Sequence, residues 1–406
     1  MLRQSYEGLT VIHEILGDFL KYLKKNWLTV ILFIFFSSGL LLFMVYVLSA
    51  DLNNVVTEII IGFISIPIVY FIIKFFYLYS PVERKRLMND FCKCVEFYKD
   101  SGLEFIEYKG DKYPSIIYYM PMRRLNLTIF DVIVVDELYK LPETIRYLYE
   151  PIEDQIKKRF LDEGYFNAPK ARMVEFNVGQ KISLKIQQTY YYYSFITNFF
   201  ADYRLFKNNI TLRQIYKNDF VKNIKFLNKE ITSNHLGFGG FIITCDGKIP
   251  LFLRNSRVAV SSRMLGNTFN GSVDWYEKES MHKSLFNELK EEIGIGMTEE
   301  DIFLMGLERN ILWLGKTDFH LIALSDKNLS ELYKIIKRSK TKEENMKLVS
   351  LDLGVAISSL DDLKQNKTII LENLDKEIKV LQKKYHLSLS LITGFYLFEN
   401  FLELKE

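Results

Sequence analysis

The residues best suited to chemistry are three glutamates in the stretch LFNELKEEIGIG, residues 285–296. On a helix, Glu288, Glu291 and Glu292 fall within an arc of about 100°, beside an apolar stripe of Leu, Phe and Ile side chains. Glu288 and Glu292 form a like-charge pair four residues apart, which destabilises a helix unless a cation lies between them. Such a trio can hold Mg²⁺ or Mn²⁺, because both prefer oxygen ligands. The same spacing also suits an ordinary solvated acidic face, which stays an open alternative.

The surrounding pattern predicts the elements that position this helix. The helix is expected to begin near Ser280 and to end at Gly294, a residue suited to a left-handed C-cap. Upstream, residues 235–256 contain two apolar runs joined by Asp246 and Gly247, a dipeptide typical of a tight hairpin turn. The alternation of strands and helices predicts mixed α/β organisation to the C-terminus. Further strands are expected near residues 302–307, 318–324 and 346–351, and helices near 329–337, 360–364 and 386–404.

The helix and its flanks resemble the Nudix box. The matching residues are Glu279, Glu288, Leu289, Glu291, Glu292, Gly294 and Ile295. The resemblance extends over about residues 230–406 and implies a mixed sheet sandwiched between helices. It also implies that Glu288, Glu291 and Glu292 bind Mg²⁺ or Mn²⁺, and that Glu288 and Glu292 are catalytic if the domain hydrolyses nucleoside diphosphate derivatives.

Two departures from the box favour binding over turnover. Asn287 stands where the box has arginine, and Val273 stands where it has glycine, with Gly271 displaced by two positions. Loss of a bidentate arginine relaxes a charged cluster, and catalysis depends more strongly on geometry than binding does.

A pocket of this kind could still hold a phosphate. Arg254, Arg257 and Arg263 lie near the strands that would wall it, and with Glu279 they are the predicted ligand-binding residues. Surface solubility is the alternative explanation of the three arginines.

The region upstream of residue 230 carries fewer signals. Residues 174–186 alternate apolar and polar side chains around Gly179, which predicts a β-hairpin. Residues 189–200, TYYYYSFITNFF, are dense in aromatic side chains, which favours a core or interface role over stacking on nucleobases. We expect an α+β region here.

Composition limits the classes of partner. The 406 residues carry 53 Lys and Arg against 50 Asp and Glu, a net charge of +3, which gives no reason to expect a nucleic acid polymer. The three cysteines, Cys92, Cys94 and Cys245, cannot form a disulfide framework and are expected to be reduced thiols of the cytosol.

The N-terminal part predicts two membrane spans. Residues 27–50 contain no charged side chain, and as a helix they would reach about 36 Å, enough to cross a bilayer core. A second apolar run follows at residues 55–79. Lysines and arginines flank the pair outside, whereas the connection carries only Asp51, so both termini are expected in the cytoplasm. A cleaved signal peptide is the alternative, but the run is too long and leads directly into a second span. Small residues midway along both spans suit packing within one hairpin or contact between hairpins of a homo-oligomer.

The predicted organisation is a cytosolic segment at 1–26, a two-helix transmembrane hairpin at 27–79, a middle region at 80–230 and a Nudix-like domain at 231–406. This combination resembles the transmembrane Nudix effectors of CBASS, the bacterial antiphage systems, with their SMODS-associated Nudix domain. The resemblance implies a protein of the bacterial inner membrane that senses a cyclic oligonucleotide and then oligomerises to disrupt the bilayer. A membrane-tethered Nudix hydrolase and a membrane scaffold for a protein partner stay as alternatives.

Overall fold

The computed structural model describes most of the chain from residue 90 onward. The described residues are 90–150, 153–162, 166–203, 210–229, 231–255, 261, 263–275, 286–287, 290, 294, 297–336 and 345–404. The predicted membrane spans at 27–50 and 55–79 lie outside them. Within the described residues, no helix combines the length and the apolar character that crossing a bilayer requires. Residues from Pro81 onward form one compact unit.

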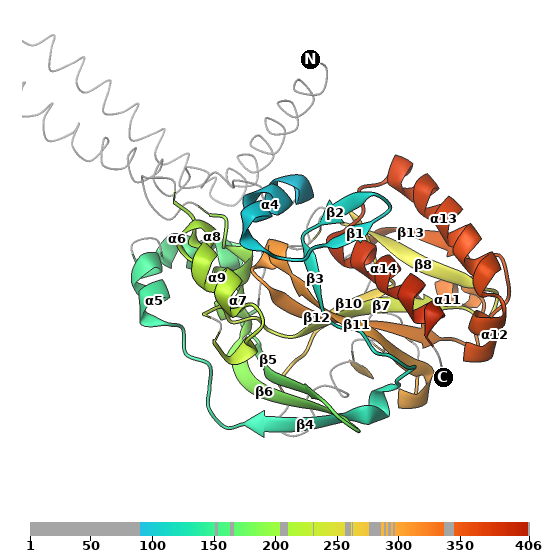
Figure 1. Cartoon of the computed structure of the whole chain (residues 1–406), viewed down its shortest axis with the longest axis horizontal. Helices are drawn as coiled ribbons and strands as arrows, with labels where there is room; N and C mark the ends of the chain where they lie inside the picture. The colour runs from blue at the N-terminus through green and yellow to red at the C-terminus, as the bar shows by residue number, and fades with distance from the viewer. Residues whose placement is uncertain are drawn as a thin grey trace, which may run out of the picture. The chain divides into compact units, whose positions relative to one another are not determined.

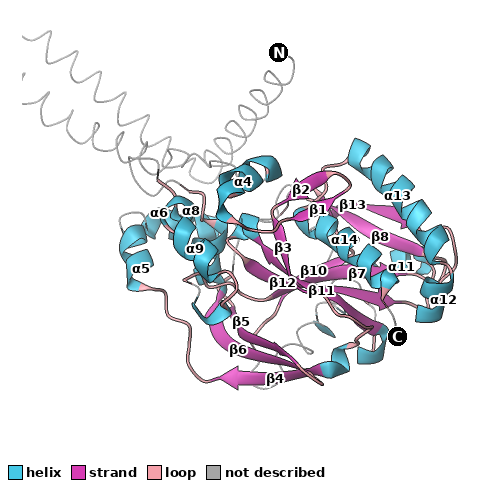
Figure 2. Ribbon diagram, in the orientation of Figure 1, coloured by secondary structure: helices cyan, strands magenta, loops and turns pink. Residues whose placement is uncertain are grey.

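The centre of this unit is a five-stranded mixed sheet (Figures 1 and 2). Its strands, in spatial order, are β10 (Phe269–Ser272), β7 (Gly237–Ile243), β12 (Lys316–Leu324), β11 (Ile302–Asn310) and β3 (Ser115–Tyr119). The β7–β12 pair is parallel and the others are antiparallel. The strands predicted near 302–307 and 318–324 are therefore confirmed as β11 and β12, each slightly longer than expected.

The edge strand β3 comes from the region upstream of residue 230. It pairs with β11 so that Ser115 lies opposite Asn310 and Tyr119 opposite Leu307. The regions 80–230 and 231–406 therefore share one sheet.

The turn at Asp246–Gly247 forms as predicted, but the strands on its two sides do not make a hairpin ladder. Gly247 has a positive φ of 69° and its N–H donates to the Thr244 carbonyl at 2.8 Å. Beyond the turn, β8 (Lys248–Arg254) joins a separate antiparallel sheet between β13 (Asn345–Asp352) and β9 (Leu265–Gly266). The Val355 carbonyl lies so close to Gly247 that a Cβ there would overlap it. Pairing with β13 thus replaces the expected pairing of β8 with β7.

A third sheet covers one face of the central sheet. It contains β4 (Phe130–Val135), β6 (Ile182–Tyr190) and β5 (Pro169–Val178), with β4 parallel to β6 and β5 antiparallel to it. The β5–β6 pair confirms the hairpin predicted at residues 174–186. Phe130 of β4 packs edge-on against Phe319 of β12, with ring centroids 5.5 Å apart. This contact belongs to the second of two hydrophobic clusters, which fills the space between the two sheets.

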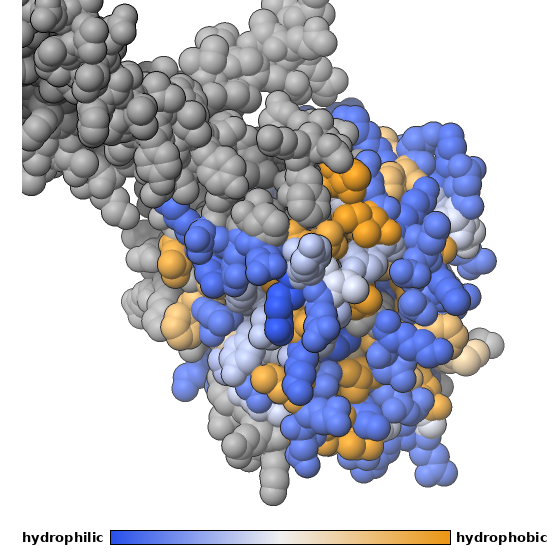
Figure 3. Space-filling model, turned by 90° about the vertical axis from the view of Figure 1, so that its left-hand side faces the viewer, coloured by the Kyte–Doolittle hydropathy of each residue, from blue (hydrophilic) through white to orange (hydrophobic). Residues whose placement is uncertain are grey.

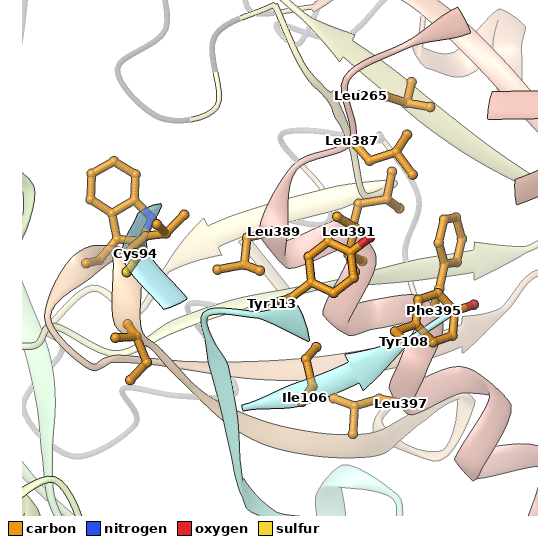
Figure 4. Close-up of a cluster of buried hydrophobic side chains, with 14 of the residues drawn as sticks. Cys94, Ile106, Tyr108, Tyr113, Leu265, Leu387, Leu389, Leu391, Phe395 and Leu397 are labelled. Atoms are coloured by element: carbon orange, nitrogen blue, oxygen red, sulfur yellow. The ribbon is translucent and has the colours of Figure 1, made fainter. Parts of the chain in front are cut away.

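The helix α14 (Leu389–Glu403) covers the opposite face of the central sheet. Its N-cap Ser388 accepts a hydrogen bond from the Leu391 N–H, and Phe395 stacks on Phe241 of β7 with ring centroids 5.4 Å apart. Figure 4 shows side chains of α14 beside Ile106 and Tyr108 of the small hairpin β1 (Ile106–Tyr108) and β2 (Asp111–Tyr113). The first and larger hydrophobic cluster is centred here.

The remaining helices surround these layers. The helices α11 (Leu329–Ile336), α12 (Leu360–Gln365) and α14 confirm those predicted at 329–337, 360–364 and 386–404. The 18-residue helix α13 (Lys367–Lys384) was not predicted, although Ile370, Leu374, Ile378 and Leu381 recur at helical spacing and are buried. Upstream lie α4 (Phe91–Phe97), α5 (Glu143–Tyr149), α6 (Glu153–Asp162), α7 (Tyr191–Ser194), α8 (Leu212–Ile215) and α9 (Lys217–Asn223).

The aromatic segment at 189–200 belongs to the core, as predicted. It forms α7 and a π-helical turn at Phe195–Phe199, and Phe195, Phe199 and Phe200 are buried in the first cluster. These buried aromatic side chains therefore stabilise the fold.

Among the residues coloured in Figure 3, most are hydrophilic, with hydrophobic residues interspersed.

The thiols in α4 have contrasting surroundings. Cys94 is buried in the first cluster, and burial raises the pKa of its thiol to about 11. Cys92, two residues earlier on the same helix, is exposed, and all three cysteines are free thiols. Their reduced state in the cytosol stays a prediction.

Candidate functional site

The described residues of the predicted box helix agree with the helix predicted to end at Gly294. Phe286, Asn287 and Lys290 are helical, and Gly294 has a positive φ of 74° with its N–H donating to the Lys290 carbonyl at 3.0 Å. The predicted helix end at Gly294 is confirmed. A Cβ on Gly294 would lie 2.7 Å from Ile335 Cγ2, so α11 packs closely against this cap. Phe286 packs on the second hydrophobic cluster, as its place in the apolar stripe predicts.

The predicted site residues are only partly within the described chain. Those outside the described residues are Glu279, Glu288, Glu291, Glu292 and Arg257. Arg254 ends β8 and is half-buried, whereas Arg263 is exposed with a φ of 58°. The N–H of Arg263 donates to the Arg254 carbonyl at 3.2 Å. The β8–β9 turn thus brings two of the three predicted arginines together.

Two lysine–carboxylate pairs lie at the end of the central sheet where β7 and β12 begin and β10 has just ended. Lys316 pairs with Asp318 across Gly237, and Lys170 of β5 pairs with Asp274, which follows β10. A side chain at position 237 would overlap the first pair. Sequence reasoning missed both pairs, although Asp274 follows the strand directly before the box.

Farther along the same face, a buried acid–base pair joins β11 and β12. Glu308 Oε1 lies 3.2 Å from His320 Nε2, and neither side chain reaches solvent. Ser115 of β3 donates to Glu308 Oε2 at 2.6 Å. Burial alone would raise the pKa of Glu308, but His320 and the hydroxyls of Ser115 and Thr393 hold that pKa below its ordinary value. The carboxylate is therefore charged at neutral pH.

Amide groups extend this row toward the other edge of the sheet. The Asn267 side-chain N–H donates to Asn270 Oδ1 at 3.1 Å and to Ser390 Oγ of α14 at 2.9 Å. Both asparagines lie over Gly239, where a Cβ would approach them to 2.6 and 2.7 Å. We call the set the polar layer; its members are Ser115, Glu308, His320, Asn267, Asn270, Ser390 and Thr393. It spans the central sheet beneath the start of α14.

His235 precedes β7 and is buried beside the rings of Tyr191 and Phe199. Burial, together with the charges of Lys316 and Lys170, holds its pKa well below the ordinary value of 6.5. The imidazole is therefore neutral at physiological pH.

The described part of the site does not by itself form a metal centre. No group of three His, Cys, Asp or Glu side chains with metal-binding spacing occurs among the described residues. Asp274 and Asp318 each pair with a lysine, and Glu308 pairs with His320. A lysine at hydrogen-bond distance competes with a cation for the same carboxylate oxygens. The glutamates of the box helix lie outside the described residues.

No protein-family model matches the chain, and no curated protein matches it. Among solved structures, the chain is similar to DR0079 from Deinococcus radiodurans (10% identity, covering 33% of this chain and 80% of that one, TM-score 0.22). It is also similar to a MutT/nudix family protein from Enterococcus faecalis (16% identity, 41% and 68% covered, TM-score 0.22).

A third similar structure is the bifunctional NMN adenylyltransferase/ADP ribose pyrophosphatase of Francisella tularensis, complexed with AMP and a manganese ion. The identity is 15%, the TM-score is 0.22, and the match covers 46% of this chain and about half, 51%, of that one. Nudix proteins are thus among the structural neighbours of this α/β unit. With TM-scores of 0.22 these likenesses do not assign the chain to a family.

Proposed function

We propose that the chain is a membrane effector of a bacterial CBASS antiviral system, whose degenerate Nudix-like domain binds a cyclic oligonucleotide. In this proposal the segments at 27–50 and 55–79 span the inner membrane, both termini face the cytoplasm, and ligand binding favours a homo-oligomer that disrupts the bilayer. A ligand that binds one assembly state more tightly shifts the population toward that state, and contacts between small residues can then bring membrane helices together.

The observation that carries the proposal is the box helix with asparagine in place of arginine. Phe286 packs against the second hydrophobic cluster, Asn287 is helical, and Gly294 has the positive φ of a helix C-cap. An amide cannot form the bidentate, charged contact with a neighbouring carboxylate that a guanidinium forms. The pairing of Asp274 and Asp318 with lysines adds support for binding without turnover.

The test uses the full chain in liposomes that contain a fluorescent dye. Cyclic dinucleotides and trinucleotides are added one at a time, and binding of each is measured separately on the same sample. Release of dye by a bound cyclic nucleotide, absent from liposomes without protein, is the expected result. Dye retention with every cyclic nucleotide that binds would contradict the proposal.

The second candidate is a membrane-tethered Nudix hydrolase of a nucleoside diphosphate derivative. It is favoured by the register of Glu279, Glu288, Glu291 and Glu292 with the box. Incubating the full chain with Mg²⁺ or Mn²⁺ and a panel of nucleotides separates the two. Metal-dependent turnover that Glu292→Gln abolishes, while binding persists, would favour the hydrolase over the sensor.

A further inference from the structure

A groove outside the box region lies where β4 begins. Figure 1 shows the position of β4 in the fold. Its volume is about 660 Å³, and its walls come from the β3–β4 connection, the β5–β6 turn, β11 and the start of α12. The described residues that line it are Arg123, Arg124, Leu125, Asn126, Thr128, Ile129, Gln180, Lys181, Phe303, Leu360 and Asp361. Small-molecule sites typically measure about 300 to 1,000 Å³, so the groove suits a ligand larger than a single phosphate.

The β3–β4 connection that forms one wall is fixed to the central sheet. The Leu304 N–H of β11 donates to the Leu125 carbonyl at 2.8 Å, and Asn126 bridges to Phe303. The Thr128 hydroxyl donates to Asn126 Oδ1 at 2.6 Å. The arginines at 123 and 124 therefore project from a backbone that hydrogen bonds hold in place.

The lining of the groove carries an excess of positive charge. Three cations line it, Arg123, Arg124 and Lys181, against the single carboxylate of Asp361. Arg123 and Lys181 are exposed, and within the described part of the chain neither forms an ion pair. Uncompensated charge at a concave surface attracts and retains anions.

Arg124 has a guanidinium edge that no described residue uses. Its Nη1 donates to the Leu360 carbonyl at 3.1 Å and the group lies 5.7 Å from the Phe401 ring. Its Nε and Nη2 atoms are buried and have no hydrogen-bond acceptor among the described residues. In Arg213 the same two nitrogens donate to the two oxygens of Asp202, at 2.6 and 3.0 Å. The Nε–Nη2 edge of an arginine binds oxyanions in a bidentate manner. A buried charged donor that lacks a hydrogen-bond acceptor costs free energy of desolvation.

The other lining groups suit an organic phosphate. Ile129 and Phe303 offer apolar surface, and Asn126, Gln180 and Thr128 offer amide and hydroxyl groups. Such a mixture can accommodate a base or sugar next to the cations.

We propose that this groove binds the phosphate groups of a nucleotide, with Arg123 and Lys181 contacting the phosphate oxygens and with Arg124, whose Nε–Nη2 edge has no acceptor among the described residues, beside them. The inference rests on the proposed function in that it names the place where the nucleotide binds. It differs from the sequence expectation, which put the ligand beside Arg254, Arg257 and Arg263.

The test measures binding of cyclic di-AMP, cyclic tri-AMP, AMP and inorganic pyrophosphate to the full chain in detergent by isothermal titration calorimetry. The double variant Arg123→Gln/Lys181→Gln removes two exposed cations and is expected to weaken binding by about tenfold or more, as loss of charge-assisted contacts does. The matched control Lys112→Gln/Arg146→Gln also removes two exposed cations, at positions that do not line the groove, and should bind as the unchanged chain does. Arg124→Lys keeps the charge but not the bidentate edge, and should weaken binding by a smaller factor.

The outcomes separate the two proposals. If a cyclic nucleotide binds and the groove variant loses that binding, the inference is supported. If a cyclic nucleotide binds the groove variant and the control variant equally, the groove proposal is wrong while the sensor proposal stands. Loss of that binding in Arg263→Gln would then place the ligand at the β8–β9 turn. If AMP or pyrophosphate binds through the groove but no cyclic nucleotide binds, the inference holds and the sensor proposal fails. If none of the four probes binds, the proposal that the groove binds nucleotide phosphates is wrong.

Discussion

The two faces of the central sheet differ in chemistry although the same strands build both. The face toward β4, β5 and β6 is apolar, with Phe238, Ile242, Phe269, Phe319 and Leu321 buried against the third sheet. The face toward α14 carries the polar layer, which runs from Ser115 to Asn270 across all the strands of the sheet. Alternation along each strand permits this contrast, because neighbouring residues point to opposite faces.

The two faces place different demands on packing. Apolar contacts stabilise without directional requirements, whereas buried polar groups need partners in fixed positions. The polar layer and the Lys316–Asp318 pair lie on the same face of the sheet. Apolar packing on the opposite face anchors the strands that hold them.

Gly240 on the apolar face is the most sensitive position. A Cβ there would overlap the Leu321 carbonyl of β12 and lie 2.7 Å from Phe269 Cζ, and backbone cannot move aside as a side chain can. We expect Gly240→Ala to cost about 4 kcal/mol or to abolish cooperative unfolding. Urea unfolding of a fragment spanning residues 81–406, followed by circular dichroism, measures this. Near-normal stability would show that β7 and β12 can separate.

Glu308 on the polar face comes next. Glu308→Ala leaves His320 buried without its acid partner, and breaking a buried pair costs about 3 kcal/mol or more. Removing both side chains in Glu308→Ala/His320→Ala should cost less than the sum of the single changes. The same unfolding experiment gives the coupling free energy. Additive costs would mean that the two groups act independently.

Part of the pH dependence of stability should arise from His235. The folded pKa of His235 lies below 6.5, so below that pH the unfolded chain binds a proton that the folded chain does not. Stability is therefore expected to fall as pH drops below 6.5, by at most about 1.4 kcal/mol per pH unit for this one group. His235→Asn should flatten the profile in this window. An unchanged slope would assign the dependence to other groups.

Gly239→Ala should have the smallest effect of the four. It is the neighbour of Gly240 but points to the polar layer, where its Cβ would meet the side-chain ends of Asn270 and Asn267. These ends can shift, at a cost of about 1 kcal/mol. Comparing the two alanine variants under identical conditions tests the contrast between the faces directly. Equal losses would remove it.

Sequence patterns predicted the positions of helices and strands better than they predicted which strands pair with each other. Periodicity located β11, β12, β13 and α14, because each has a regular apolar pattern of sufficient length. Strand pairing depends on residues far apart in the chain, so neither the insertion of β3 beside β11 nor the separation of β8 from β7 could be read locally. Helix α13 had a readable pattern and was overlooked.

The candidate site could be predicted from the sequence to a smaller degree than the helices and strands. The glycine cap at Gly294 followed from one residue type, because positive φ strongly favours glycine. Lys316 and Asp318 lie two residues apart on β12 and so point to the same face, a pairing that the spacing alone could have indicated. The pairing of Glu308 with His320 depends on the register between β11 and β12, which no spacing in the sequence fixes. The groove at Arg123 and Lys181 joins two segments whose proximity exists only after folding.

The two thiols of α4 offer a natural handle for spectroscopy. Cys94 is protonated at neutral pH because its pKa is about 11, and it is enclosed by the core, so an alkylating reagent cannot reach a reactive thiolate there. Cys92, two residues earlier on the same helix, is exposed, and Cys245 is half-buried. A maleimide fluorophore should therefore mark Cys92 first in the unmodified chain. That label would report on the surroundings of α4 without any engineered cysteine.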